Sequence, residues 1–274
     1  MRKKFGQNFL IDARARDILI DALPKEAGWG VWEIGPGIGA MTSGLLERGC
    51  QVTAFEIDEG FCKILHDFFD TNPNFTLIEG DVMKTWKEGR ARPAPTGTPG
   101  GAPVSCYLLG NLPYTIGAAL IADFIENQQF FQRQVVMLQK ETADRMLAKP
   151  GSKNYSSFSV LCQSVYTIEP LLRLKGASFY PEPHVESAAV TMTLKKDINL
   201  PASFYPLVRG LFAQRRKTVR NNLNNFLKRT TEGTENPEFL LEKAGLDGKL
   251  RAEDLSLEDF TALAKIVEKD YNSR

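Results

Sequence analysis

Histidine and cysteine are scarce in this 274-residue chain, which has only His66, His184 and four cysteines. Two imidazoles are too few for a histidine-based metal site, and no cysteines have the close spacing of a zinc motif. Because Cys50, Cys106 and Cys162 fall in segments with a buried pattern, we expect reduced core thiols and no disulfides. The composition therefore predicts a protein without a bound metal.

Long apolar runs are also missing, and no secretory signal is evident. We therefore expect a cytoplasmic protein that does not enter a membrane. The hydrophobic content of 43% is sufficient for one large domain and a smaller one. The formal net charge of +1 does not by itself indicate a partner.

Acidic residues are absent from residues 203–229, a stretch that is rich in basic ones. Its cations are Arg209, Arg215, Arg216, Lys217, Arg220, Lys228 and Arg229. A solvated helix face is the ordinary interpretation of a charge run, but such faces usually mix both signs. With a second basic segment near the N-terminus, this stretch predicts a surface for a polyanion such as RNA.

Strand-like and helical segments alternate along the first two thirds of the chain. Strands are expected at residues 31–34, 51–57, 75–78, 104–109 and 134–139, with helices at 40–48, 60–69, 118–127 and 141–149. This alternation is typical of an α/β doubly wound parallel sheet. Residues 168–174 and 188–194 are expected to close the sheet as a pair of strands.

Two segments interrupt this order. Lys87–Pro103 is rich in proline and glycine, which predicts a surface insertion without chemistry of its own. After a linker at residues 196–203 the pattern is helical, and Ser256 with Asp259 resembles a capping box for the last helix. We therefore expect one domain over residues 1–198 and a small helical domain over residues 199–274.

A glycine loop follows the first expected strand of the sheet. Gly35, Gly37 and Gly39 permit a tight turn and a close approach to a ligand. The spacing also fits a relaxed dinucleotide fingerprint, with Glu56 following Gly35 by 56 − 35 = 21 residues. The loop predicts a cofactor that contains adenosine, with Glu56 on the ribose hydroxyls and Asp81 on the adenine amino group. A structural glycine turn and a solvated strand-end acid are the alternatives.

The segment Asn111-Leu112-Pro113-Tyr114 follows the expected fourth strand. The Asn111 amide oxygen can accept from an amino group, and Pro113 favours an extended Leu112 whose carbonyl is a second acceptor. Tyr114 offers a flat face for stacking. The segment therefore predicts a receptor for a planar ring with an exocyclic amine, although an Asn-Pro turn with a core tyrosine would look the same.

Further short segments complete a pattern over the whole chain: Lys4–Leu10, Glu33–Gly39, Glu56–Asp58, Gly80–Asp81, Asn111–Tyr114, Gln139–Glu141 with Arg145, Phe179–Ala188 and Phe212–Thr218. In this order they resemble the ribosomal RNA adenine dimethyltransferases, and the Phe212–Thr218 block favours the small-subunit branch. The chain departs from the family pattern at Gly117-Ala118, at Ser156 and in the long insertion.

The resemblance implies a class I methyltransferase sheet over residues 1–198, which binds S-adenosylmethionine, and a helical docking domain over residues 199–274. The implied substrate is two adjacent adenosines near the 3′ end of small-subunit rRNA, within a ribosomal assembly particle, and we expect a monomer. The implied cofactor contacts are Asn8, Leu10, Gly35, Gly37, Glu56, Ile57, Asp81, Val82 and Asn111. The implied catalytic segment is Asn111, Leu112, Pro113 and Tyr114, and the expected RNA contacts are Arg215, Arg216, Lys217 and Arg220.

The expected mechanism needs neither a metal nor a strong base, because the sulfonium is already an activated methyl donor. Hydrogen bonds to Asn111 and to the Leu112 carbonyl would favour a pyramidal amine, and Tyr114 would hold the extruded base. The alternatives are a nicotinamide-dependent oxidoreductase, a non-catalytic RNA-binding or transcription factor on this fold, and a large-subunit rRNA methyltransferase.

Overall fold

The computed structural model describes residues 8–24, 29–88, 106–230 and 236–272. Most of the expected insertion at residues 87–103 lies outside the described residues, as do Arg2, Lys3 and Lys4 of the N-terminal basic segment, whereas its Arg14 and Arg16 are described. The chain divides into two compact units, of which the first comprises residues 1–124, 128–143 and 167–194. The second comprises residues 125–127, 144–166 and 195–274.

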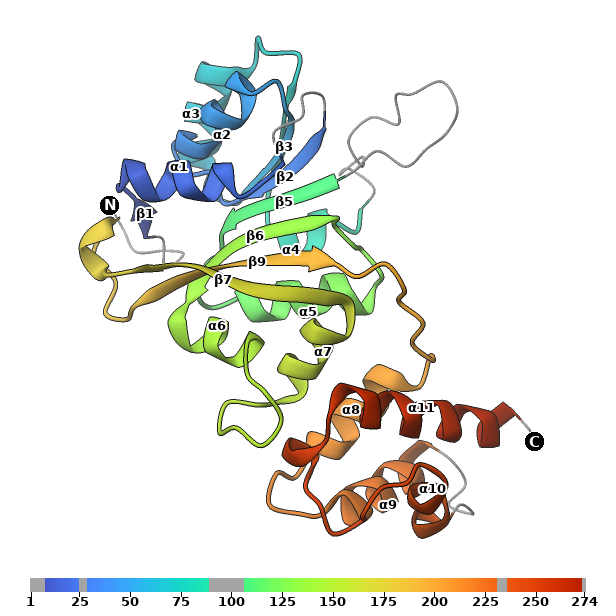
Figure 1. Ribbon diagram of the computed structural model, residues 1–274. Coiled ribbons are helices and arrows are strands. Elements are labelled where there is room, and N and C mark those ends of the chain that lie inside the picture. The colour runs from blue at the N-terminus through green and yellow to red at the C-terminus, as the bar shows by residue number, and fades with distance from the viewer. Residues whose placement is uncertain (1–7, 25–28, 89–105, 231–235, 273–274) are drawn as a thin grey trace. The chain divides into compact units, whose positions relative to one another are not determined.

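The first unit is built on a seven-stranded sheet with the strand order β4-β3-β2-β5-β6-β9-β7 (Figure 1). Its strands are β2 (Gly30–Ile34), β3 (Gln51–Glu56), β4 (Phe75–Glu79), β5 (Cys106–Asn111), β6 (Arg133–Gln139), β7 (Tyr166–Leu174) and β9 (Ser187–Leu194). The pairs from β4 to β6 are parallel, whereas β9 runs antiparallel to β6. This order confirms the predicted doubly wound sheet and its two closing strands.

Helices cover both faces of the sheet because its central strands are apolar on both sides. The helices of this region are α1 (Ala13–Asp21), α2 (Ala40–Glu47), α3 (Glu59–Phe69), α4 (Val82–Thr85), α5 (Gly117–Glu126) and α6 (Lys140–Met146). In β2, Val31 belongs to the same core cluster as Leu19 of α1 and Leu45 of α2. The next residue, Trp32, points to the opposite face, where its ring lies 6.2 Å from that of Phe124 in α5.

A second, two-stranded sheet joins distant parts of the chain. Strand β1 (Phe9–Leu10) pairs antiparallel with β8 (Phe179–Tyr180), which follows the short 3-10 helix η1 (Gly176–Ser178). Leu10 and its partner Phe179 pack into the core of the first unit. The sequence analysis predicted no strand at either position, because the pairing joins residues about 170 positions apart.

The second unit consists of helices around its own core. They are α7 (Ser157–Val165), α8 (Phe204–Phe212), α9 (Val219–Thr230), α10 (Pro237–Lys243), the 3-10 helix η2 (Ala252–Asp254) and α11 (Leu257–Asn272). Phe204, Leu223 and Phe260 are fully buried there. The predicted capping box is present, because the Asp259 N–H donates to Ser256 Oγ at 3.1 Å and the Ser256 N–H donates to Asp259 Oδ2 at 2.8 Å.

Residues 144–166 belong to the second compact unit together with the C-terminal helices. The domain boundary predicted at residue 198 had assigned them to the first domain. Helix α7 explains the difference, since its Val160 lies in the same hydrophobic cluster as Phe204 and Leu207 of α8. The assignment of catalysis and docking to separate domains stays a prediction. Among the described helices, none has the length and apolarity needed to cross a membrane.

Candidate active site

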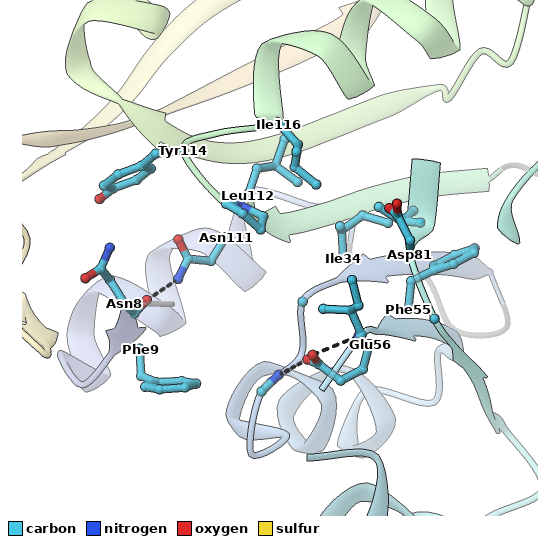
Figure 2. A pocket seen from close by; sticks show the side chains of 16 residues that line it. Asn8, Phe9, Ile34, Phe55, Glu56, Asp81, Asn111, Leu112, Tyr114 and Ile116 are labelled. Atoms are coloured by element: carbon cyan, nitrogen blue, oxygen red, sulfur yellow. Dashed lines mark hydrogen bonds between the residues drawn. The ribbon is translucent and has the colours of Figure 1, made fainter. Parts of the chain in front are cut away.

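A pocket opens at the carboxyl ends of β2, β3, β4 and β5 in the first unit (Figure 2). Its empty volume is about 730 Å³, counting the part open to solvent. The strand order reverses between β2 and β5, and ligands of open α/β sheets bind at such switch points. The pocket is lined by Asn8, Phe9, Ile34, Gly35, Gly37, Phe55, Glu56, Ile57, Gly80, Asp81, Val82, Asn111, Leu112, Pro113, Tyr114 and Ile116.

The structure brings together almost all of the site residues expected in the first unit. Leu10 is the exception, because it packs against the hydrophobic core instead of lining the pocket. Five lining residues were not predicted: Phe9, Ile34, Phe55, Gly80 and Ile116. Each of them lies next to or near a predicted residue in the sequence. They carry no polar side-chain group, so nothing in the sequence was a reason to place them in a binding site.

Glu56 joins the glycine loop to the end of β3. Its Oε2 accepts from the Gly37 N–H at 3.1 Å, and its Oε1 accepts from the N–H groups of Ile57 and Asp58, both at 2.9 Å. Gly37 has φ +59°, and an added Cβ would lie 3.1 Å from the Phe9 ring, so glycine is required here. Burial raises the pKa of Glu56, while these backbone donors oppose that rise.

Asp81 and Ile57 form one end of the pocket with Val82. One Asp81 oxygen accepts from the Met83 N–H at 3.0 Å and thereby caps α4. The N–H of Val82, the first residue of α4, has no acceptor within the helix. The Ile57 side chain is 40% exposed although it is apolar. A carboxylate, a helix N-terminus and an open apolar surface can together hold a flat heterocycle.

Asn111 ends β5 at the other end of the pocket, and its amide group has a fixed orientation. Its Nδ2 donates to the Asn8 carbonyl at 2.8 Å. The amide oxygen therefore faces away from Asn8, toward the side where Tyr114 lies in Figure 2. No described residue donates to this oxygen. It is an acceptor directed into the pocket.

The Leu112 carbonyl is a second acceptor beside Asn111. The Leu112 N–H donates to the Met137 carbonyl at 3.0 Å, which holds the segment against β6. The carbonyl of Pro113 is occupied, since it accepts from the N–H groups of Ile116 and Gly117 at 3.0 Å. The Leu112 carbonyl has no such donor among the described residues. Of these two carbonyls, only that of Leu112 can receive a ligand proton.

Tyr114 borders the same end of the pocket, and its hydroxyl is hydrogen-bonded to the Ser187 hydroxyl. Burial raises the pKa of Tyr114, so the phenol is neutral at physiological pH. Ser187 lies in the Phe179–Ala188 segment that carried the family resemblance, but the sequence indicated no role for it. No described aromatic ring stacks on Tyr114, which lines the pocket.

Glu33 is a buried carboxyl group behind the glycine loop to which the sequence analysis gave no role. It is fully buried in β2, and Thr42 Oγ1 donates to its Oε2 at 2.7 Å. No described group donates to its Oε1. Burial raises the pKa of Glu33 to about 7, against the lowering effect of Thr42 and with a smaller contribution from the charge of Glu56.

The predicted RNA contacts lie in the second unit but not all on a helix, which corrects the helical interpretation. Arg215, Arg216 and Lys217 occupy the turn between α8 and α9, and only Arg220 lies on α9. The buried Asn222 shapes this turn, because its Nδ2 donates to the carbonyls of Leu211 and Gln214. The run of basic residues therefore extends from the turn after α8 into α9. The spacing of hydrophobic residues alone did not predict where α8 ends.

Two of these cations have acidic partners from outside the acid-free stretch. Arg215 contacts Glu253 at 2.7 Å and also donates to the carbonyl of Lys153, and Arg220 contacts Glu238 at 2.9 Å. Arg216 and Lys217 are exposed, and neither forms an ion pair with a described residue. Of the four predicted RNA contacts, the structure thus pairs Arg215 and Arg220 with acidic residues and leaves Arg216 and Lys217 without an ion pair to a described residue.

Metal ligands do not gather in the described part of the chain, where no group of three or more histidine, cysteine or acidic residues is placed to hold an ion. The doubly wound sheet and its switch-point pocket, bordered by a glycine loop and two strand-end acids, have the architecture of the class I S-adenosylmethionine-dependent methyltransferases.

The particular family follows from comparison with known proteins. The chain belongs to the ribosomal RNA adenine dimethylase family, whose model matches residues 1–269. It is 44% identical over 272 residues to ribosomal RNA small subunit methyltransferase A of Treponema denticola, covering 97% of this chain and 89% of that protein. The protein of the same name from Bacillus licheniformis is 39% identical over 270 residues, covering 96% of this chain and 90% of that one.

Solved structures support the fold. A dimethyladenosine transferase from Plasmodium falciparum matches with a TM-score of 0.78 and 24% identity, covering 96% of this chain and 98% of that one. The 23S rRNA methyltransferase ErmE matches with a TM-score of 0.66 and 21% identity, covering 95% of this chain and 100% of that one. Both likenesses extend over nearly the full chain, so they include the helical C-terminal region as well as the sheet.

The buried Glu33 leads to a prediction about pH and stability. Its pKa in the fold, about 7, lies above the ordinary value of 4.5. The fold therefore favours the protonated form of Glu33. The stability that this group contributes is fully present below pH 4.5 and is lost as the pH rises through 7. We expect wild type and Glu33→Gln to have similar melting temperatures near pH 5. At pH 8, wild type should be less stable than the variant, on the order of 1–3 kcal/mol. Melting profiles that stay parallel from pH 5 to 8 would contradict this.

Proposed function

We propose that this pocket binds S-adenosylmethionine and one target adenine, and that the protein transfers methyl groups to the exocyclic N6 of adenosines in small-subunit rRNA. When bound, the cofactor supplies a methyl group on a positively charged sulfur. The observation that carries the proposal is the pair of open acceptors, Asn111 Oδ1 and the Leu112 carbonyl, beside the ring of Tyr114.

The cofactor would occupy the end of the pocket formed by β3 and β4. Glu56 would accept from the ribose hydroxyls with the lone pairs that its backbone donors leave, and Asp81 would accept from the adenine amino group. Ile57 and Val82 would pack against the adenine ring of the cofactor. None of the described lining residues is basic, which suits a cationic cofactor better than a dinucleotide with its anionic pyrophosphate.

The target base would lie at the Asn111 end. An amine with two protons can donate one to Asn111 Oδ1 and the other to the Leu112 carbonyl, which favours a pyramidal nitrogen with an available lone pair. Tyr114 would stack on the extruded ring, replacing the neighbours that the base loses when it leaves its helix. These three groups orient the nitrogen without a general base.

Substrate selection would depend on contacts outside the pocket. The relatives that are 44% and 39% identical bear names that specify the small subunit, which supports that branch over the large-subunit alternative. Arg216 and Lys217, exposed on the turn between α8 and α9, would contact phosphates, while Arg215 anchors the turn through Glu253. Phosphate contacts position an enzyme without reading bases, so structured RNA in an assembly particle is the expected partner.

Removal of the Glu56 carboxylate should weaken cofactor binding. In calorimetry we expect Glu56→Ala to lose roughly 1–3 kcal/mol of S-adenosylmethionine affinity, the usual cost of losing charge-assisted hydrogen bonds. Glu79 is a matched control, because it pairs with Glu56 across β3 and β4 but does not line the pocket. Equal losses in Glu56→Ala and Glu79→Ala would mean that the effect is not specific to the proposed ribose site.

Asn111→Ala tests the proposed chemistry directly. We expect turnover on small-subunit particles that lack these methyl groups to fall by roughly 100-fold or more, because the lost acceptor acts mainly in the transition state. Particle affinity, measured by filter binding, should change little. A loss of turnover fully explained by weaker particle binding would place Asn111 in docking and not in catalysis.

The two free cations of the turn make a separate prediction. The double reversal Arg216→Glu with Lys217→Glu should weaken particle binding and lower the salt slope of log Kd by about 2, at roughly one unit for each lost phosphate contact. The double reversal of Lys228 and Arg229 at the far end of α9 changes net charge equally and is the control. Equal effects from both pairs would indicate a nonspecific charge effect instead of docking by the turn.

A further inference from the structure

The ring of Tyr114 is held at its far end by a side chain from another part of the sheet. Its hydroxyl is hydrogen-bonded to that of Ser187, the first residue of β9, which is 1% exposed. Ser187 lies opposite Gln139 in the β6–β9 pair, and the Lys140 N–H donates to the Glu186 carbonyl at 2.9 Å. The backbone at Ser187 is therefore held against the end of β6 and the start of α6, which gives its hydroxyl a fixed base.

The near end of the ring is also fixed. Tyr114 follows Pro113, whose carbonyl accepts two N–H groups at the start of α5. A tyrosine side chain has two torsions, and attachment at the backbone and at the hydroxyl oxygen fixes the first of them and with it the position of the ring axis. Among the described residues no other ring contacts Tyr114. The Ser187 contact thus sets the position of the ring against which a base would stack.

The two methyl transfers make different demands on the position of this ring. In each transfer the amine nitrogen forms a bond to the methyl carbon, the carbon–sulfur bond breaks with its electron pair left on sulfur, and one N6 proton passes to water. Before the first transfer the amine has two protons, one for Asn111 Oδ1 and one for the Leu112 carbonyl. Before the second transfer it has one, so one acceptor loses its donor and stacking must hold more of the base.

We propose that Ser187 is a positioning residue for the second methyl transfer, because it fixes the Tyr114 ring when the amine can make only one hydrogen bond. This inference rests on the proposed function. Loosening the ring should slow the second transfer more than the first, so the monomethylated product should accumulate.

The test is the ratio of N6-methyladenosine to N6,N6-dimethyladenosine, measured by mass spectrometry of digested RNA from unmethylated small-subunit particles in single-turnover reactions. In Ser187→Ala we expect the second rate constant to fall roughly 10-fold and the first by no more than about 3-fold. Tyr114→Phe keeps the ring but removes its hydroxyl, so it should give the same change in ratio. The double variant should match either single one, since all three lack the same hydrogen bond.

Ser187→Thr, which retains a hydroxyl, should restore the wild-type ratio. Thr191→Val is the control for a general weakening of β9, since Thr191 lies in the same strand with 4% exposure. An unchanged ratio in Ser187→Ala, or an equal change in Thr191→Val, would overturn the role of Ser187. Wild-type protein that makes neither product would instead overturn the proposed function.

Discussion

The hydrogen bond from Asn111 Nδ2 to the Asn8 carbonyl determines what the pocket can recognise. An asparagine amide has a donor side and an acceptor side of nearly equal shape, and only a fixed partner distinguishes them. Because the donor is committed to Asn8, the acceptor faces the position proposed for the target amine. The same bond joins the end of β5 to the segment that enters β1, so the pocket wall and the acceptor are ordered together.

Carboxyl groups in the glycine-loop region are kept buried at an energetic cost. Glu56 is stabilised by three backbone N–H groups, whereas Glu33 has a single donor, Thr42, among the described residues. The pKa of both groups is raised by burial, most clearly for Glu33. Such an energetic cost is typical of sites whose environment serves a ligand. Acidic groups without a cation among the described lining residues suit a positively charged cofactor.

The second unit uses its charges in two ways. Glu253 and Glu238 come from segments beyond the acid-free stretch and bind Arg215 and Arg220, which fixes those cations to the fold. Arg216 and Lys217 remain exposed on a turn that Asn222 holds from the inside. A single run of basic residues therefore contains two kinds of cation. Those with an acidic partner stabilise the fold, and those without an ion pair to a described residue are exposed.

The sequence by itself determined the sheet, the glycine loop, the strand-end acids and the Asn111 segment. These features depend on local hydrophobic periodicity, on backbone freedom at glycine and on side-chain chemistry within a few residues. Tertiary structure alone decided the orientation of the Asn111 amide, the β1–β8 pairing, the Ser187 contact with Tyr114 and the partners of Arg215 and Arg220. Each of these joins residues 18 to about 170 positions apart, and hydrophobic periodicity does not specify which distant groups will meet.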